Sequence, residues 1–332
     1  MTSDRVTHNP RVSIVIRCYN EERHIGRLLD GIMEQSHPEI EIIVVDSGSS
    51  DATVTIASRY PTTIVSIDPR EFSFGRALNL GFEQARGEFV VIASAHVYPS
   101  YRTWIHSLLA PFSDPKVALV YGKQRGNEIT KYPERQIFAR WFGEHSINSQ
   151  HHPFCNNANA AIRRSLWQRF PYDESLTGLE DIAWAKTALE SGYRICYQAD
   201  AEIVHVHEET YAQIYNRYRR EAIAMKSIFP EEHFNLADFL RLYASNVGSD
   251  LYHAWHDGQL LRSLGSIFGF RLMQFLGTYR GFGLHGPVPS DLKQRFYYPN
   301  RLTRMTAKTP EKHSSVRIEY KEKSSPHPKE RT

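Results

Sequence analysis

Residues 87–96 read Gly-Glu-Phe-Val-Val-Ile-Ala-Ser-Ala-His, and this stretch decides the predicted fold. Residues 88–93 are a run of mostly β-branched and aromatic side chains, which is typical of a buried strand. The run ends abruptly in the small or polar side chains of Ser94, Ala95 and His96. In an open α/β sheet, ligands bind beyond the carboxyl ends of the strands. We therefore expect a central strand whose end faces a ligand.

Length and composition set the limits for the fold. The chain has 332 residues, of which 41% are hydrophobic, enough for one large domain with an appendage or for two domains. Its formal charge of +3 equals the surplus of seven Lys/Arg over four Glu within residues 306–332. The remainder is therefore close to neutral, which argues against a dedicated nucleic-acid-binding protein.

The cysteines and the apolar runs bear on the compartment. Cys18, Cys155 and Cys196 are widely spaced and odd in number, which predicts neither a disulfide framework nor a zinc knuckle. The polar residues 1–10 lack the apolar segment of a signal peptide, and no apolar run approaches the roughly 18 to 20 residues needed to span a bilayer. These features predict a cytoplasmic protein.

Strand and helix patterns alternate through the first hundred residues. We expect strands at 12–16, 41–46, 63–67 and 88–93, separated by helices at 21–35, 51–60 and 75–86. Such alternation predicts a mostly parallel sheet covered by helices on both faces. Because the crossovers are right-handed, the carboxyl ends of these strands meet at one edge.

Polar residues follow three of these strands. Tyr19, Asn20 and Glu21 follow the first strand, Asp46 to Ser49 the second, and Ser94 to His96 the fourth. Asn, Asp, Ser and Gly occur in turns for conformational reasons alone. Three such strand ends on one edge nevertheless favour a binding site.

Three motifs together resemble the family 2 glycosyltransferases of the GT-A fold. They are Tyr-Asn-Glu-Glu at 19–22, Val-Val-Asp-Ser-Gly-Ser-Ser-Asp-Ala-Thr at 44–53, and the segment 76–88 leading into the central strand. No Gly-x-Gly-x-x-Gly follows the first strand and no P-loop is present, which argues against Rossmann dehydrogenases and P-loop NTPases. The resemblance covers about residues 11–210.

The resemblance implies an α/β fold with a GT-A-type, mostly parallel nucleotide-binding sheet, and a nucleotide-diphospho-sugar as donor. Asp46 would contact the base or ribose, and Tyr19 and Glu21 would line the nucleotide pocket. The other donor-site residues implied are Asn20, Ser47, Arg76, Asn79, Ser94 and His96.

Residues 172–181 (YDESLTGLED) resemble the family's Glu-Asp signature, in which the aspartate is the general base. A sugar hydroxyl needs such a base, because it is a poor nucleophile until its proton is removed. The resemblance thus assigns catalysis to Asp181, and acceptor binding to Asn157, Glu180 and Trp184. Alternatively, Glu180 and Asp181 merely complement the positive end of a helix.

The metal site is the main departure from the family pattern, because Ser94-Ala95-His96 replaces the Asp-x-Asp metal motif. His205 and His207 would point to the same face of an extended segment. One hypothesis is that a divalent cation, Mn²⁺ or Mg²⁺, is held by His96 with His205 or His207 and the substrate diphosphate. Alternatively no metal is used, and Arg, Lys and helix N-termini stabilise the leaving diphosphate. A further alternative is that His205 and His207 are only structural residues at the sheet edge.

The rest of the chain divides into an insert and a helical extension. Residues 122–156 read as a long irregular insert, where specificity often resides. Helical patterns follow at 211–229, 236–255 and 260–279, and they pack either on the catalytic domain or a partner subunit, or on a membrane through Arg262, Arg271 and Arg280. We divide the chain into a flexible N-terminus (1–10), a catalytic domain (11–230), a helical extension (231–305) and a disordered basic tail (306–332).

We predict an inverting glycosyltransferase that moves a sugar to a saccharide or lipid-linked acceptor during surface polysaccharide synthesis, without nucleic acid as a partner. The resemblance implies a location in the cytoplasm. Peripheral contact with the inner face of the membrane and assembly into a homo-oligomer are both left open. Two alternatives stay open: an inactive sugar-nucleotide-binding module, and a nucleotidyltransferase of related fold.

Overall fold

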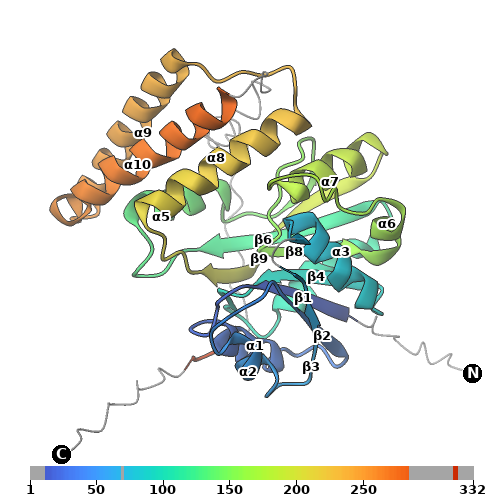
Figure 1. Cartoon of the computed structure of the whole chain (residues 1–332). Coiled ribbons are helices and arrows are strands. Elements are labelled where there is room, and N and C mark those ends of the chain that lie inside the picture. The colour runs from blue at the N-terminus through green and yellow to red at the C-terminus, as the bar shows by residue number, and fades with distance from the viewer. Residues whose placement is uncertain (1–11, 69–70, 284–316, 321–332) are drawn as a thin grey trace, which may run out of the picture.

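A computed structural model describes residues 12–68, 71–283 and 317–320 (Figure 1). Within these residues, nine strands form one sheet in the order β3-β2-β1-β4-β8-β6-β9-β5, with β7 paired to β9. The strands are β1 (Val12–Cys18), β2 (Ile40–Asp46), β3 (Thr62–Ser66), β4 (Phe89–Ser94), β5 (Val97–Pro99), β6 (Val117–Arg125), β7 (Ile147–Gln150), β8 (Asn159–Arg163) and β9 (Arg194–His205).

The sheet is mostly parallel, as predicted. β1 pairs in parallel with both β2 and β4, β2 pairs in parallel with β3, and β6 does so with β9. β8 runs antiparallel between β4 and β6, so its first residues lie at the edge where β4 ends. The carboxyl ends of β1, β2 and β4 therefore share one edge with the start of β8.

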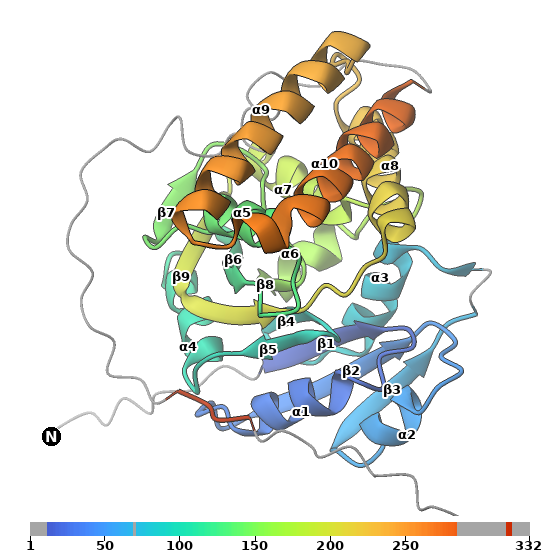
Figure 2. The same cartoon turned by 90° about the vertical axis from the view of Figure 1, so that its left-hand side faces the viewer.

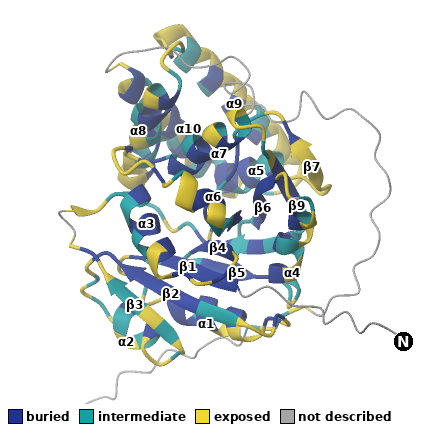
Figure 3. Cartoon of the chain, turned by 90° about the vertical axis from the view of Figure 1, so that its right-hand side faces the viewer, coloured by how far each residue is buried: buried dark blue, intermediate teal, exposed yellow. Residues whose placement is uncertain are grey.

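Two apolar layers cover the sheet, because side chains alternate between its faces. On β1, Val15 belongs to one core cluster, and Ile14 and Ile16 belong to the other. The first face is covered by α3 (Phe74–Gln84), α6 (Arg164–Arg169) and α7 (Glu180–Glu190), and the second by α1 (Ile25–Met33), α2 (Thr53–Ala57) and α4 (Trp104–Leu109). Figure 3 shows the central strands as the most deeply buried part of the fold.

The first two helices are shorter than predicted. α1 begins at Ile25 rather than at residue 21, and α2 covers only residues 53–57. The reason is that the loop after β1 bonds to the loop after β2: the Glu21 N–H donates to Thr53 Oγ1 (2.7 Å), and the Glu22 N–H donates to Asp51 Oδ2 (3.1 Å). Side-chain acceptors of this kind compete with helix formation.

The prediction of an irregular insert at 122–156 was wrong. β6 continues to Arg125, and α5 (Tyr132–Trp141) and β7 follow it. β9 is one long strand from Arg194 to His205. Asn159 joins these strands, since its Nδ2 donates to Lys123 O (3.1 Å) and Ala201 O (2.7 Å).

A helical layer follows the sheet, as expected. α8 (Tyr211–Ile228), α9 (Leu236–His256) and α10 (Leu260–Phe282) pack together and against α5 (Figures 1 and 2). Arg271, predicted as a membrane contact, is instead 1% exposed and ion-paired to Asp250 (Nε–Oδ2, 2.7 Å). Among the described helices, none is both long and apolar enough to cross a membrane.

Part of the predicted disordered tail packs on the sheet. The Ile318 N–H donates to Ser100 O (3.2 Å), and the Tyr320 hydroxyl donates to Pro99 O (2.6 Å). The predicted flexible N-terminus (1–10), residues 284–305 of the extension and the rest of the tail lie outside the described residues.

Candidate functional site

A cleft of about 730 Å³ lies at the carboxyl edge of the sheet, beneath α8. It gathers side chains from the ends of β1, β4 and β9, the start of β8 and the first turns of α7 and α8. Ten of the residues predicted for the site line it: Tyr19, Asn20, Glu21, Ser94, His96, Asn157, Glu180, Asp181, His205 and His207.

The loop after β1 forms one wall. Asn20 has a φ of 53°, a left-handed conformation that Asn tolerates better than most residues. Its N–H donates to Ser49 Oγ (2.8 Å), and its Oδ1 accepts from the Ser50 N–H (2.8 Å). These bonds hold the loop rigidly and leave Tyr19 57% exposed at the cleft.

Asp46 and Ser47 are buried and do not line the cleft. Asp46 Oδ2 accepts from the N–H groups of Gly48 (3.1 Å) and Ser49 (3.0 Å), and Gly48 takes a φ of 85°. Asp46 thereby shapes the turn that supports Asn20. Its predicted contact with a base or ribose stays a prediction.

Arg76 and Asn79, predicted for the donor site, lie on α3 outside the cleft. The Asn79 side chain is buried, its Nδ2 donating to Tyr172 O (3.0 Å) and its Oδ1 accepting from the Tyr172 N–H (3.0 Å). Arg76 is ion-paired with Glu71 and Glu174. Both residues therefore hold the segment that leads into α7, because Asn79 bonds to Tyr172 and Arg76 pairs with Glu174.

Asp181 lies in the first turn of α7 and faces the cleft. Its Oδ2 accepts from the Asn157 N–H (3.1 Å), and its Oδ1 accepts from the Ile182 N–H (2.8 Å). Burial, together with the negative charge of Glu180, raises the pKa of Asp181 from its ordinary value of 3.8 to about 7. The preceding Leu179 has a φ of 56°, a strained conformation of the kind that clusters at functional sites.

The three predicted acceptor residues differ in placement. Glu180 is ion-paired to Arg17 (2.8 Å) and accepts a hydrogen bond from Asn157 Nδ2 (3.3 Å). Glu180 and Asn157 therefore both lie beside Asp181. Trp184 does not reach the cleft: it is 3% exposed, packs against Tyr172, and donates its indole N–H to Phe170 O (2.6 Å). Its position one turn further along α7 points it into the core.

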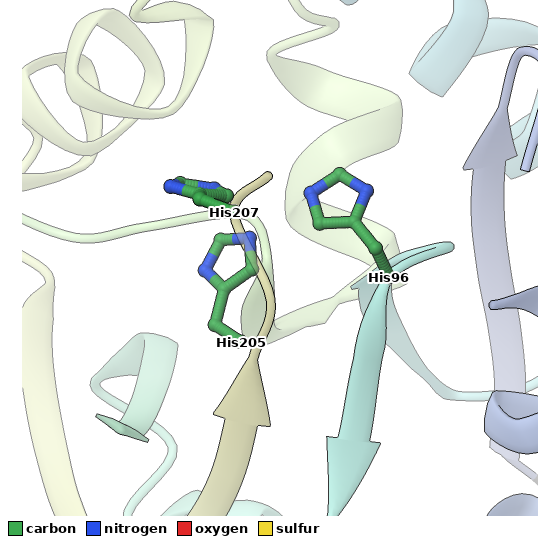
Figure 4. A group of neighbouring side chains, drawn as sticks. All are labelled: His96, His205 and His207. Atoms are coloured by element: carbon green, nitrogen blue, oxygen red, sulfur yellow. The ribbon is translucent and has the colours of Figure 1, made fainter. Parts of the chain in front are cut away.

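His96, just after β4, converges with His205 at the end of β9 and with His207 just beyond it (Figure 4). The ring centroids of His205 and His207 are 4.1 Å apart, and those of His96 and His205 are 5.0 Å apart. Backbone pairing sets this proximity, because Val97 pairs with His205 and the Val206 N–H donates to His96 O (3.1 Å). Burial, together with the nearby His207, His96 and Arg217, lowers the pKa of His205 well below its ordinary value.

Two parts of the site were not predicted from the sequence. Gln124 and Glu134, from the supposed irregular insert, bond to His205 and His207. The Phe74 ring packs against two guanidinium groups, its centroid 5.0 Å from that of Arg17 and 4.5 Å from that of Arg220. Arg220 lies within the helical pattern predicted at 211–229.

The sheet topology and the edge cleft define the chain as a GT-A-type α/β protein. The mannosyltransferase PcManGT from Pyrobaculum calidifontis, solved with GDP-Man and Mn²⁺, matches it with a TM-score of 0.59 over 84% of this chain and 87% of its own. Staphylococcus aureus TarS 1-349, solved with UDP-GlcNAc, matches 81% of this chain and 89% of its own with a TM-score of 0.50. At 22% and 16% identity, these likenesses show the fold alone.

The model of glycosyl transferase family 2 matches residues 13–170, the part of the chain that carries the three motifs described above. The O-antigen chain rhamnosyltransferase WbaN of Salmonella anatum is 28% identical over 223 residues, 63% of this chain and 70% of the relative. The glycosyltransferase AglE of Haloferax volcanii is 28% identical over 58% of this chain and 65% of its own length.

Proposed function

We propose that the protein is an inverting glycosyltransferase that moves a sugar from a nucleotide-diphospho-sugar to a saccharide or lipid-linked acceptor, with Asp181 as general base. The observation that carries this proposal is the position of Asp181. It lies at the cleft on a rigid helix start, held by two backbone N–H groups, and its pKa is raised to about 7.

The proposed reaction is one direct displacement. Asp181 takes the proton of the acceptor hydroxyl as that oxygen forms a bond to the anomeric carbon. The bond from this carbon to the donor diphosphate breaks, and the nucleoside diphosphate leaves with the electron pair. A single displacement inverts the anomeric configuration. A carboxylate with a pKa near the working pH suits this task.

The donor would lie along the wall formed by Tyr19, Asn20 and Glu21. Arg17 and Arg220, packed on Phe74 within the same cleft, provide positive charge on that side. Charge-assisted hydrogen bonds from guanidinium groups to phosphate are strong and directional. This arrangement supports binding of a diphosphate between the β1 loop and α8.

The histidines at the strand ends of the cleft fit a divalent cation. PcManGT was solved with Mn²⁺, and His96, His205 and His207 lie at the strand ends of this chain's cleft. A cation bound there would neutralise negative charge on the leaving diphosphate. Asp181 deprotonates the acceptor hydroxyl without help from the ion. The residues on the acceptor side of the cleft likewise orient the acceptor without it.

The biological setting is proposed from relatives. WbaN and the S. typhimurium protein RfbN are named O-antigen chain rhamnosyltransferases, each 28% identical to this chain. Their names support a role in surface polysaccharide synthesis and make a rhamnosyl donor the first to test. We place the protein at the inner face of the cytoplasmic membrane, bound peripherally where a lipid-linked acceptor is presented.

An inactive sugar-nucleotide-binding module is the second candidate. One observation favours it: no carboxylate stands at Ser94-Ala95-His96, where the family has its Asp-x-Asp motif. The two candidates differ in turnover and not in donor binding.

The test combines binding and turnover. UDP-, GDP- and dTDP-sugars, rhamnosyl donors included, are screened first by thermal shift, since a ligand at a hundred times its Kd adds about 2.7 kcal/mol of stability. Bound donors are then assayed for nucleoside diphosphate release with and without acceptor, and the product anomer is read by NMR. An inverted product is expected. A retained configuration would refute the mechanism, and binding without any release would favour the inactive module.

A further inference from the structure

We propose that His96, His205 and His207 form a three-imidazole site that takes a borderline transition-metal ion such as Mn²⁺, Co²⁺ or Zn²⁺ in preference to Mg²⁺ or Ca²⁺. This inference rests on the proposed function in one respect: the donor diphosphate would occupy the remaining coordination positions. The metal preference itself follows from this chain's own residues.

The first observation is convergence on a rigid frame. Each of the three histidines offers a ring nitrogen, and these nitrogens lie within 4.8 Å of one another. Three nitrogens bound at about 2.0–2.1 Å to one tetrahedral ion are about 3.3 Å apart, a spacing that small ring rotations can reach. The backbone bond from the Val206 N–H to His96 O fixes the two strand ends that carry the rings.

The second observation is that each ring is already oriented by an oxygen acceptor. His205 Nδ1 lies 2.7 Å from Gln124 Oε1, His207 Nδ1 lies 2.6 Å from Glu134 Oε1, and His96 Nδ1 lies 2.7 Å from Glu21 Oε1. In each pair the Nδ1–H donates, which leaves the lone pair of Nε2 free. Metal-binding histidines are oriented in this way by a second layer of acceptors.

The third observation is an unpaired buried nitrogen. His205 is 5% exposed, and its Nε2 has no hydrogen-bond partner. Buried polar atoms are nearly always paired, so this one calls for an explanation. A metal ion between the three rings would satisfy it.

The fourth observation concerns charge. Among the described residues that line the cleft, four arginines (17, 23, 217 and 220) face six carboxyl groups (Glu21, Glu180, Asp181, Glu208, Glu209 and Glu221). Three of these arginines are ion-paired to glutamates. A diphosphate entering such a cleft needs additional positive charge, which a divalent ion held by the three imidazoles provides.

The ligand chemistry sets the preference. Imidazole suits Mn, Co, Cu, Ni and Zn ions, whereas Mg²⁺ and Ca²⁺ are hard ions that prefer oxygen ligands. The Asp-x-Asp carboxylates that would provide such oxygens are absent here. Three protein ligands with open positions are also typical of sites where an ion meets substrate.

The experiment titrates the full chain, without donor, with Co²⁺ and follows visible absorption and calorimetry. We expect one Co²⁺ per chain, displaced by Zn²⁺ and not by a hundredfold excess of Mg²⁺. His96→Ala, His205→Ala and His207→Ala should each weaken Co²⁺ binding by at least about tenfold, and Gln124→Leu by about tenfold through loss of ring orientation. Circular dichroism and thermal unfolding establish that each variant is folded.

Two histidine variants serve as matched controls. His24 lines the same cleft but bonds to the Tyr98 hydroxyl, and His253 is exposed on α9. His24→Ala and His253→Ala should keep wild-type affinity. Three outcomes would overturn the site. They are an equal loss of Co²⁺ affinity in His24→Ala, an unchanged Co²⁺ affinity in all three ligand variants, and displacement of Co²⁺ by stoichiometric Mg²⁺. Because no sugar donor is present, these outcomes are independent of whether the chain transfers a sugar.

Discussion

Asp181 shows how one residue obtains its chemistry from its surroundings. It is an ordinary aspartate in sequence, but in the fold it is buried beside Glu180 and held by two backbone N–H groups. Burial and a like charge favour the protonated form, while the hydrogen bonds and Arg17 favour the charged form. The result is a carboxyl group that titrates near neutral pH.

Asp181→Asn should reduce turnover by at least about 10², the low end for loss of a general base, because an amide cannot take the hydroxyl proton. Donor affinity should stay within about twofold. The measurement is steady-state nucleoside diphosphate release together with donor calorimetry. Glu190→Gln, at the exposed far end of the same helix, is the control. Near-normal turnover in Asp181→Asn would exclude it as the base.

The pH dependence follows from the raised pKa of Asp181. The base is charged only above its pKa, so kcat/KM should rise with pH through about 7. Glu180→Gln should move this limb to lower pH, because it removes a negative charge that raises the pKa and releases Arg17 from its partner. An unchanged limb in Glu180→Gln would show that another group titrates.

The same shift has a consequence for stability. Between about pH 4 and 7 the folded chain holds a proton on Asp181 that the unfolded chain has lost. Stability at this site therefore decreases as pH rises through that interval, the opposite of a salt-bridged aspartate.

Among the elements, α9 and α10 are joined by a buried ion pair. Arg271 bonds to Asp250 through Nε (2.7 Å) and Nη2 (3.0 Å), and its Nη2 also donates to Pro133 O on α5 (3.4 Å). Asp250 is fully buried and has Arg140 at 3.7 Å as a second cation. This network ties both helices to α5.

Arg271→Gln should lower the free energy of unfolding by about 3 kcal/mol, because it leaves a buried carboxylate with only its more distant partner. Urea unfolding followed by circular dichroism measures it. Arg262→Gln, exposed on the same helix, should stay within about 0.5 kcal/mol of the wild type. Equal effects of the two substitutions would mean that the Asp250 pair does not hold the helices together.

At the scale of the whole molecule, the turn between α9 and α10 projects from the helical layer (Figure 1). Large apolar side chains are exposed around it: Tyr252 by 57%, Trp255 by 65% and Leu261 by 86%. Arg262 is exposed beside them. Aromatic and basic residues together suit the interface of an anionic membrane.

Trp255→Ala combined with Leu261→Ala should reduce binding to vesicles of anionic lipid by at least about tenfold, because both side chains would leave the lipid interface. Co-sedimentation measures it, with neutral vesicles and the surface variant Leu236→Ala as controls. If the wild type does not bind vesicles and instead forms a dimer that the double variant dissociates, the surface is a protein interface.

Much of the fold could be predicted from the sequence. The buried runs 12–16, 41–46 and 88–93 and the helical spacings between them indicated a mostly parallel sheet, because hydrophobic periodicity is a local property. The residues at the strand ends followed from that topology, since parallel strands end at one edge. Tyr19, Glu21 and His96 could therefore be predicted at that edge, whereas Asp181 was identified through the resemblance of residues 172–181 to the Glu-Asp signature.

The remaining features depend on contacts between distant segments. Asn79 and Trp184 carry polar groups that a substrate could use, and only packing shows that Tyr172 and Phe170 already bind them. Gln124 and Glu134 became part of the site because β6 and α5 place them behind β9.

Short-range patterns in the sequence were sufficient to predict a mostly parallel sheet and the polar residues at its strand ends. Tertiary contacts are what bring His96, after β4, beside His205 at the end of β9 and His207 just beyond it. Their convergence depends on the pairing of β5 with β9 across more than a hundred residues of chain. No local pattern encodes such a pairing, which forms when the two strands bury their shared faces.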